Sequence, residues 1–393
     1  MVWLRQTLAI TWVSLTSLRY RLDNALVALI GFAGVVLTLV GVLSIRAGFQ
    51  TTLQTTGSPQ RAIVLRGGSG TEINSVLSGD DARIIAQAPG IAAGARGPLA
   101  SPELLVLINL PKRSAGTEAN VAFRGVEPAA RRVHDQVRVV AGRWFHPGLN
   151  EVVAGVAAAR HFRGLDVGAT FKSGRRTWRV VGLFSDGGGL HDSEIWTDLP
   201  TLQGVYQRGN SVDSVIVRLA SPTTFGLFKK TLEGDPRLNI SAETEPEYFA
   251  EQAHGLSLFI NIVGGIIGAL MGGGAVFGAV NTMYTAVASR TREIATLRAL
   301  GFTRSSVMVS VLAESMLLGL IGGAAGALIA YALFNGFEAS TLNQFSQVAF
   351  RFRVTPGLML AGVAYALAMG LLGGILPARR ALGLPIAAGL RAL

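Results

Sequence analysis

Four arginines and one glutamate stand close together in a part of the chain that otherwise carries almost no charge. The stretch from Ser289 to Val307 reads SRTREIATLRALGFTRSSV, and long uncharged segments precede and follow it. Arginine guanidinium groups can form paired hydrogen bonds with carboxylates, and the leucines and isoleucine between them can bury apolar area against a partner. These residue types are suited to a binding surface, so the elements that position them must be found next.

Helical spacing gives this stretch two different faces. In a helix that ends at Leu300, the residues Ile294, Leu297 and Leu300 lie within an arc of about 120°. Gly301 can end that helix and Thr303 can cap the next one. The sequence therefore predicts a short amphipathic helix at the inner membrane surface. The simpler alternative is a loop whose arginines only anchor it on one side of the membrane, which explains the charge but not the apolar ridge or the glycine.

The segments around the charged stretch are long enough to cross a membrane. Half of the 393 residues are hydrophobic and only 15% are charged, which is unusual for a soluble chain. A helix that crosses the bilayer core needs about 20 apolar residues. The first uncharged run exceeds the core of a signal peptide and no small-residue cleavage site follows it, so we expect it to be retained. The four runs are 24–45, 252–289, 305–337 with Glu314 as its one charge, and 354–378.

The expected fold is a membrane protein with four transmembrane α-helices, an extended stalk and a large mixed α+β periplasmic domain between the first and second helices. Short runs rich in Val, Ile and aromatic residues, bounded by Gly, Pro and Asp, predict the strands of that domain. The predicted segments are an amphipathic helix on the cytoplasmic face (1–23), helix 1 (24–47), the periplasmic domain (48–253), helix 2 with the stalk (254–288), the charged insert (289–303), helix 3 (304–335), a short periplasmic loop (336–355), helix 4 (356–377) and a cytoplasmic tail (378–393).

The positive charge of the chain lies in its membrane part. The net charge is +11, but residues 48–253 contain 22 basic and 20 acidic residues, against 13 and 4 elsewhere. Cytoplasmic loops collect Lys and Arg, so we expect an inner-membrane protein, surrounded by membrane lipid, with both termini in the cytoplasm and the large domain in the periplasm. We expect no nucleic-acid partner, and the absence of cysteine excludes disulfides.

Glycines recur at a spacing of four residues in the predicted membrane helices. They are Gly264, Gly268 and Gly272 in helix 2, and Gly319 and Gly323 in helix 3. Small residues at this spacing let helices approach closely in lipid. They indicate either a dimer interface or sliding contact, or ordinary packing within one bundle.

Glu314 lies about ten residues into the third helix, where an unpaired carboxylate is costly. A role with a proton or a substrate is one interpretation. Pairing with an arginine near the membrane surface is the simpler one.

Sites for catalysis or metal binding are not expected in this chain. There is no phosphate loop of the form GxxxxGK[ST], and GGSGTE at 67–72 lacks its lysine, so a plain loop is expected there. The five histidines are scattered in the sequence, without HExxH or a close pair, which argues against a metal site. FSDGGGLHDSE at 184–194 contains His191, Asp192 and Glu194, and we interpret it as a turn near the surface because no paired nucleophile accompanies it.

Several of these stretches resemble a known family. The charged insert, followed by LAESMLLGLIGGAAG, is similar to the pattern R-x-x-E-I-x-x-L-R-A-L-G-x-x-R with a third span that bears an early Glu. This pattern marks FtsX-like permease domains, the membrane subunits of MacB-type ABC transporters. LPARRALGLPIAAGLR resembles the end of that family, although it is about one residue longer. GRWFHPGLNEVVAGVAAARHF, TWRVVGLFSDGG and DSEIWTDLPTLQ resemble the MacB-type periplasmic core domain.

The resemblance implies that the insert is a coupling helix, which docks onto a separate cytoplasmic ATPase. The chain is then a non-catalytic permease subunit without a cofactor of its own, and ATP and Mg bind to the partner ATPase. The residues that the resemblance assigns to docking are Arg290, Arg292, Glu293, Ile294, Leu297, Arg298, Leu300 and Gly301.

The resemblance also implies a function. ATP hydrolysis on the partner moves the coupling helices, and the stalks carry this movement to the periplasmic domains (mechanotransmission), which export or extract a substrate from the periplasm or the outer leaflet. A second permease copy or a homologue completes a dimer, and a periplasmic adaptor with an outer-membrane duct is a further expected partner. The alternatives are a permease that extracts lipoproteins or lipids, an FtsX-like regulator of cell-wall hydrolases without transport, and a membrane receptor without an ATPase.

Overall fold

The computed structural model describes residues 22–95, 97–343 and 346–383. These residues form two compact units. The helical unit contains residues up to Gly48, Leu256–Phe337 and residues from Phe352 onward, and the sheet unit contains Phe49–Gly255 and Glu338–Arg351. The expected amphipathic helix 1–23 and the terminal Pro-to-Arg pattern lie largely or wholly outside the described residues.

Four helices are long and apolar enough to cross a membrane, within the part of the chain that the structure describes. Each corresponds to one of the uncharged runs. Their bounds are α2 (Leu22–Thr56), α8 (Glu245–Ser289), α10 (Arg304–Phe334) and α11 (Pro356–Gly383), and the short helix α9 (Thr291–Ala299) connects α8 to α10.

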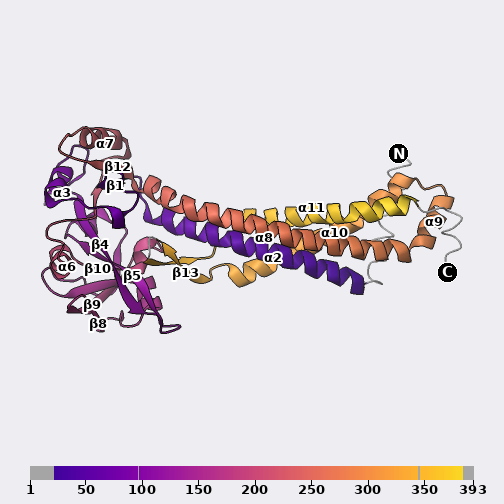
Figure 1. Cartoon of the computed structure of the whole chain (residues 1–393), viewed down its shortest axis with the longest axis horizontal. Coiled ribbons are helices and arrows are strands. Elements are labelled where there is room, and N and C mark those ends of the chain that lie inside the picture. The colour runs from indigo at the N-terminus through magenta and orange to yellow at the C-terminus, as the bar shows by residue number, and fades with distance from the viewer. Residues whose placement is uncertain (1–21, 96, 344–345, 384–393) are drawn as a thin grey trace. The chain divides into compact units, whose positions relative to one another are not determined.

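The long helices lie side by side in the helical unit (Figure 1). Their shared core consists of apolar residues from all four, among them Phe32 of α2, Met283 of α8, Leu318 of α10 and Met369 of α11. Contacts between α10 and α11 are especially extensive. An added side-chain carbon on Gly326 of α10 would collide with the backbone of α2, so the absence of side chains at the crossings is what lets these backbones approach.

Two of the membrane helices continue beyond their apolar runs. Helix α2 extends to Thr56, past residue 47 where the sequence predicts the first span to end, and α8 begins at Glu245 rather than at 254. Helix α8 has 45 residues, and at 1.5 Å per residue it is about 67 Å long. Because a bilayer core is about 30 Å thick, α8 contains more helix than a single crossing requires. The ends of α2 and α8 therefore belong to the sheet unit.

The sheet unit is built on a ten-stranded mixed sheet (Figure 1). Its strand order is β12-β1-β11-β4-β5-β10-β7-β9-β6, with β8 paired to β9. Most neighbours are antiparallel, whereas β10 with β5 and β7 with β9 are parallel. The bounds are β1 (Arg61–Arg66), β4 (Ala100–Pro111), β5 (Glu118–Val126), β6 (Arg138–Gly142), β7 (Glu151–Gly155), β8 (Thr170–Ser173), β9 (Arg176–Ser185), β10 (Glu194–Asp198), β11 (Ser214–Arg218) and β12 (Ile240–Thr244).

Short helices and one small ribbon complete this unit. They are η2 (Glu72–Asn74), α3 (Gly79–Ala86), the ribbon β2 (Ala93–Gly94) with β3 (Gly97–Pro98), α4 (Ala130–Val133), α5 (Val156–His161), η3 (Leu190–Ser193), α6 (Leu199–Val205), η4 (Pro222–Thr224) and α7 (Phe225–Glu233). The expectation of a mixed α and β domain is confirmed. Its main core contains the fully buried Trp178, whose ring lies 4.9 Å from that of Phe123.

The segment expected to be a short periplasmic loop is a β-hairpin. Strand β13 (Glu338–Asn343) pairs antiparallel with β14 (Ser346–Arg351), and both belong to the sheet unit. The Ala349 N–H donates to Ser193 Oγ at 3.0 Å, and Arg160 pairs with Glu338 at 3.0 Å. The chain therefore returns to the sheet between α10 and α11, which the polar composition of this segment did not indicate.

Candidate functional site

Helix α9 ends as its sequence predicts. Gly301 has a φ of +94°, and its N–H donates to the Arg298 carbonyl at 3.2 Å while the Phe302 N–H donates to the Leu297 carbonyl at 3.1 Å. This left-handed position favours glycine. The Thr303 side chain then accepts the Ser306 N–H at 3.3 Å and caps α10. The stop and the cap are confirmed.

The apolar side of α9 packs against its own chain. Ile294 is buried and Leu297 is half-buried. They contact a cluster from the end of α8, the start of α10 and the end of α11, made by Val287, Val307, Val311, Ala378 and Ala381. Two residues of the predicted ridge thus hold α9 in place rather than project from it.

A buried ion pair connects the start of α9 with α10. Arg290 Nη1 lies 2.8 Å from Glu314 Oε2, and both side chains are at least nine-tenths buried. Arg290 Nε is also 3.8 Å from Glu293. At the other end of α9, Arg298 Nη1 donates to the Leu382 carbonyl of α11 at 3.4 Å. A hollow lies beside the ion pair, and its walls come from α8, α9 and α10.

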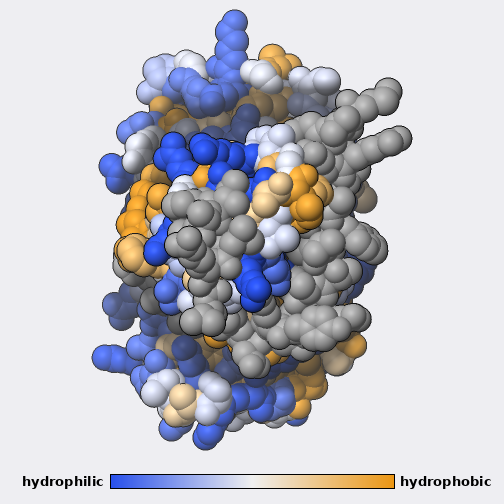
Figure 2. Space-filling view, turned by 90° about the vertical axis from the view of Figure 1, so that its right-hand side faces the viewer, coloured by the Kyte–Doolittle hydropathy of each residue, from blue (hydrophilic) through white to orange (hydrophobic). Residues whose placement is uncertain are grey.

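The outer side of α9 carries the remaining predicted docking residues. Arg292 and Glu293 are exposed, and Leu300 is 73% exposed although it is apolar. Figure 2 looks onto the end of the helical unit that carries α9, where hydrophilic side chains gather beside a smaller hydrophobic patch. The structure therefore divides the eight predicted residues into two sets. The inward set is Arg290, Ile294, Leu297 and Arg298, and the exposed set is Arg292, Glu293, Leu300 and Gly301.

The predicted glycines lie at helix crossings within the chain. An added side-chain carbon on Gly264 or Gly268 of α8 would meet Val42 or Leu39 of α2, at 3.1 and 3.4 Å. Gly272 faces Tyr365 of α11, whose hydroxyl donates to the Gly268 carbonyl at 2.9 Å. In α10, Gly319 and Gly323 face Ala366 of α11. These contacts pack the glycines within one bundle, and the alternative of a dimer interface or a sliding contact stays a prediction.

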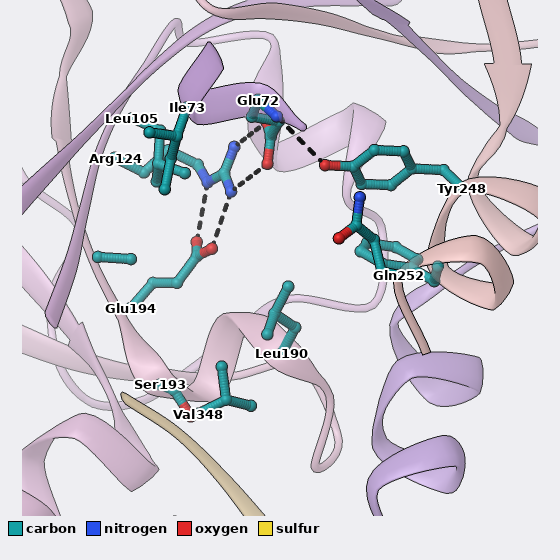
Figure 3. A pocket seen from close by; sticks show the side chains of 12 residues that line it. Glu72, Ile73, Leu105, Arg124, Leu190, Ser193, Glu194, Tyr248, Gln252 and Val348 are labelled. Atoms are coloured by element: carbon teal, nitrogen blue, oxygen red, sulfur yellow. Dashed lines mark hydrogen bonds and ion pairs between the residues drawn. The ribbon is translucent and has the colours of Figure 1, made fainter. Parts of the chain in front are cut away.

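The sheet unit contains a buried ionic cluster that sequence reasoning missed. Arg124, in the middle of β5, is only 1% exposed and pairs with three carboxylates. Its guanidinium lies 2.8 Å from Glu72, 3.0 Å from Glu103 and 2.8 Å from Glu194. Figure 3 shows it between Glu72 and Glu194, with Tyr248 of α8 beside Glu72. The surrounding hollow is lined by side chains from η2, β4, β5, η3, β10, α8 and β14.

Two histidines complete the cluster. His134 Nε2 lies 2.8 Å from Glu103 Oε1, and His191 Nδ1 lies 3.1 Å from Glu194 Oε2. The two rings meet edge to face with centroids 4.9 Å apart. The histidines are therefore not scattered in space, although the described residues contain no group of three or more side chains that could hold a metal ion.

The interpretation of 184–194 as a surface turn is wrong for its charged residues. Asp186, His191, Asp192 and Glu194 are all buried. Asp192 accepts the N–H groups of Asp186 and Gly188, and its backbone lies where a side chain on Gly155 would otherwise stand. Backbone donors and a neighbouring glycine allow a charged loop to be buried, which its polar composition concealed.

Charge complementarity outweighs burial at the cluster. Burial alone would raise the pKa of Glu194, but the charges of Arg124 and His191 hold it well below its usual range. Burial alone would lower the pKa of His191, but Glu194 and Asp186 raise it overall. At Asp186 the charge of His191 does not outweigh burial, which raises the pKa of Asp186 to about 6. Burial likewise raises the pKa of Asp213, which faces Glu72 and Arg124, to about 7.

One signal in the sequence could have indicated this cluster. Arg124 interrupts the predicted strand NVAFRGV, and Glu103 directly precedes LLVLINL. A charge in the interior of an apolar strand is rarely buried without a partner. Two opposite charges on predicted strands therefore indicate that the two residues pair.

The four long apolar helices and the mixed sheet unit define the class of a membrane protein with one large sheet domain, and comparisons with known proteins identify its family. The model of the FtsX-like permease C-terminal domain matches residues 258–386. The model of the MacB-like periplasmic core domain matches residues 25–234, more than half of the chain. The chain therefore belongs to the MacB-like, FtsX-like permease family of ABC transporters. Together with the four apolar helices, this indicates an inner-membrane protein with a periplasmic domain.

Curated relatives are similar over part of their length. The macrolide export ATP-binding/permease protein MacB 1/2 of Paracoccus denitrificans is 27% identical over 307 residues, which is 73% of this chain and 44% of that protein. The MacB protein of Agrobacterium fabrum is 26% identical over 273 residues, 66% of this chain and 40% of that protein. The alignments thus span less than half of these relatives.

Solved structures of periplasmic or extracellular regions also align. The periplasmic region of MacB from Actinobacillus actinomycetemcomitans has a TM-score of 0.36 at 15% identity and covers 49% of this chain and 92% of that one. The extracellular domain of the transporter YknZ from Gram-positive bacteria has a TM-score of 0.35 at 13% identity, with 47% of this chain and all of that one covered.

Proposed function

We propose that this chain is the membrane subunit of a MacB-like ABC transporter and works by mechanotransmission. A separate cytoplasmic ATPase binds ATP and Mg²⁺, and its movement enters the permease at α9. Helices α2 and α8 carry this movement to the periplasmic domain, which exports or extracts a substrate from the periplasm or the outer leaflet. A second permease copy or homologue completes the assembly, and a periplasmic adaptor with an outer-membrane duct joins it.

The observation that carries this proposal is the way α9 is held. Its inner side is fixed by Ile294 and by the Arg290–Glu314 ion pair, while Leu300 and Arg292 remain exposed. One side of α9 packs against three membrane helices and the other side is exposed. Such a helix can bind a partner and transmit its movement to the membrane helices. We therefore assign direct docking to the exposed set, and a supporting role to Arg290, Ile294 and Leu297.

The test is retention of the ATPase. Leu300→Asp places a charge on an exposed apolar contact and should abolish co-purification of the ATPase, while the protein still inserts into the membrane. Leu297→Asp should also abolish it, but there the loss includes damage to the packing beneath α9, because Leu297 is half-buried.

The control is Ser305→Asp, which adds the same charge at an exposed position in the first turn of α10. It should leave the ATPase bound. Undiminished ATPase binding by Leu300→Asp would remove α9 from the docking surface and with it the route by which energy enters.

A further inference from the structure

A buried arginine joins the ends of the two long helices inside the sheet unit. Arg61 is the first residue of β1 and is 1% exposed. Its Nη2 donates to the carbonyl of Thr56, the last residue of α2, at 2.5 Å. Its Nε donates to Glu245, the first residue of α8, at 2.7 Å. Arg61 thus holds the end of α2 and the start of α8 with one rigid guanidinium group.

Consecutive residues connect Arg61 to the cluster around Arg124. Asp135 pairs with Arg61 at 3.3 Å, and the preceding His134 bonds to Glu103, which pairs with Arg124. The two buried arginines are therefore linked through the adjacent residues Asp135 and His134 and the carboxylate of Glu103. This link leads from the helix ends to the middle of the sheet.

Two further contacts close the network on the other side. The N–H of Leu190, next to His191, donates to Thr56 Oγ1 at 2.5 Å. The N–H of Glu72 donates to the Tyr248 hydroxyl of α8 at 3.3 Å (Figure 3). The start of α8 is thus connected to Glu72, a partner of Arg124, and the end of α2 to the neighbour of His191, which bonds to Glu194.

We propose that this network, which we call the helix–sheet clamp, makes the ends of α2 and α8 move together with the sheet, and that protonation of His191 tightens it. The clamp consists of Arg61, Glu72, Glu103, Arg124, His134, Asp135, His191, Glu194 and Glu245. Its use in carrying movement to the periplasmic domain rests on the proposed function. The clamp itself is a property of the folded chain and is testable without the ATPase.

Charge balance gives the dependence on protonation. Around Arg124 stand the three carboxylates of Glu72, Glu103 and Glu194, so these four side chains together have two negative charges in excess. Protonation of His191, which bonds to Glu194, reduces this excess, and uncompensated buried charge is costly. The titratable and charged groups that face the two rings are Glu103 from β4, Arg124 from β5, Asp186 from the loop after β9, Glu194 from β10, and each other.

The direction of the pH dependence follows from the pKa of His191. The pKa of His191 is raised in the folded chain, because Glu194 and Asp186 outweigh the effect of burial. The stabilisation that protonated His191 gives to the folded chain is thus complete below the pKa of an unfolded histidine. It disappears as the pH rises through the raised pKa of the folded chain. Asp186 acts in the same direction, since its raised pKa of about 6 makes its ionised form costly as the pH rises. The clamp should therefore be tight in mild acid and loose in mild alkali.

The test is the spread of distances between α2 and the sheet. The natural chain has no cysteine, so Gln54→Cys on α2 and Lys172→Cys on β8, both exposed, provide a pair of spin-label sites in the full chain in nanodiscs. Pulsed electron paramagnetic resonance measures the distance between the two labels. The distance distribution should be narrow at about pH 5.5 and wider at about pH 8, on either side of the ordinary histidine pKa. Equal widths at both pH values would overturn the proposal.

Variants assign the effect to His191. His191→Gln keeps a neutral hydrogen-bonding group but removes the titratable charge, so the distribution should stay wide at both pH values. His191→Asn should behave in the same way and serves where the glutamine variant does not fold. The control is His146→Gln, because His146 also bonds a carboxylate, that of Glu151, but its side chain is 64% exposed.

Each outcome is decisive for the clamp. The proposal fails if the distance distribution of His191→Gln still narrows in acid, or if His146→Gln removes the narrowing as fully as His191→Gln does. Failure of the ATPase to bind α9 would remove the proposed function yet leave the pH-dependent width unchanged. The two failures are therefore distinguishable.

Discussion

Arg290 and Glu314 show how a charge is kept inside the membrane part of the chain. Their atoms lie 2.8 Å apart and both side chains are nearly inaccessible, in surroundings where an ion without a partner is costly. The pair joins Arg290, the residue before α9, to Glu314 in the third turn of α10, so the position of α9 depends on it. A role in positioning α9 follows from this geometry without any transfer of protons.

A double-mutant cycle should measure this coupling. Glu314→Leu alone removes the carboxylate that lies 2.8 Å from the buried Arg290, and should destabilise the protein by about 3 kcal/mol. Arg290→Leu alone should have a similar cost. The double variant should recover most of the loss, because both charges leave the buried site together. Thermal unfolding in detergent gives the free energies.

Additive losses in the cycle would contradict this account. In that case the two side chains would act independently, and the position of α9 would depend on its apolar contacts alone. Arg292→Leu is the matched control, because Arg292 lies on the same helix but is exposed, and it should change the stability little.

At the scale of elements, the bundle depends on backbone contacts that only glycine allows. A side-chain carbon at Gly319 would lie 2.6 Å from the Ala366 carbonyl oxygen of α11. A carbonyl cannot move aside without displacing its helix. The close approach of α10 and α11 therefore has a steric cause that is specific to this position.

Gly319→Ala should destabilise the bundle by about 1–3 kcal/mol, the usual cost of overpacking. Gly265→Ala in α8 is the control, since an added carbon there has nothing within 4 Å. That change should be neutral or slightly stabilising, because alanine favours helix over glycine. Thermal unfolding of both variants in the same detergent separates the two effects, and equal losses would argue against the steric explanation.

At the scale of the whole molecule, charge distribution predicts the orientation in the membrane. The excess of basic residues lies outside 48–253, and basic loops stay in the cytoplasm. A single cysteine in place of exposed Ser114 in the sheet unit should react with an impermeant maleimide in intact spheroplasts. A cysteine in place of exposed Ser305 at the start of α10 should react only after lysis.

The unmodified protein is the background control, because it contains no cysteine. Labelling of Ser305→Cys in intact spheroplasts, with protection of Ser114→Cys, would reverse the predicted orientation. The proposed position of the ATPase would then fail as well.

The sequence by itself determined those features whose cause is local. Run length and composition identified the four long helices. The spacing of Gly301 and Thr303 identified the end of α9 and the cap of α10, because a left-handed turn and a side-chain cap involve only neighbouring residues. Short runs rich in Val, Ile and aromatic residues, bounded by turn residues, indicated strands in the same way.

Only the tertiary structure decided which charges meet. Arg124 collects carboxylates from three separate elements, and two histidines that are distant in the sequence lie ring to ring. The loop with Asp192 is buried because Gly155, on another strand, leaves room for its backbone. Likewise, the apolar ridge of α9 proved to face inward at Ile294, since α8, α10 and α11 converge there. Burial and pairing are properties of the surroundings, and surroundings are made by contacts between residues far apart in the chain.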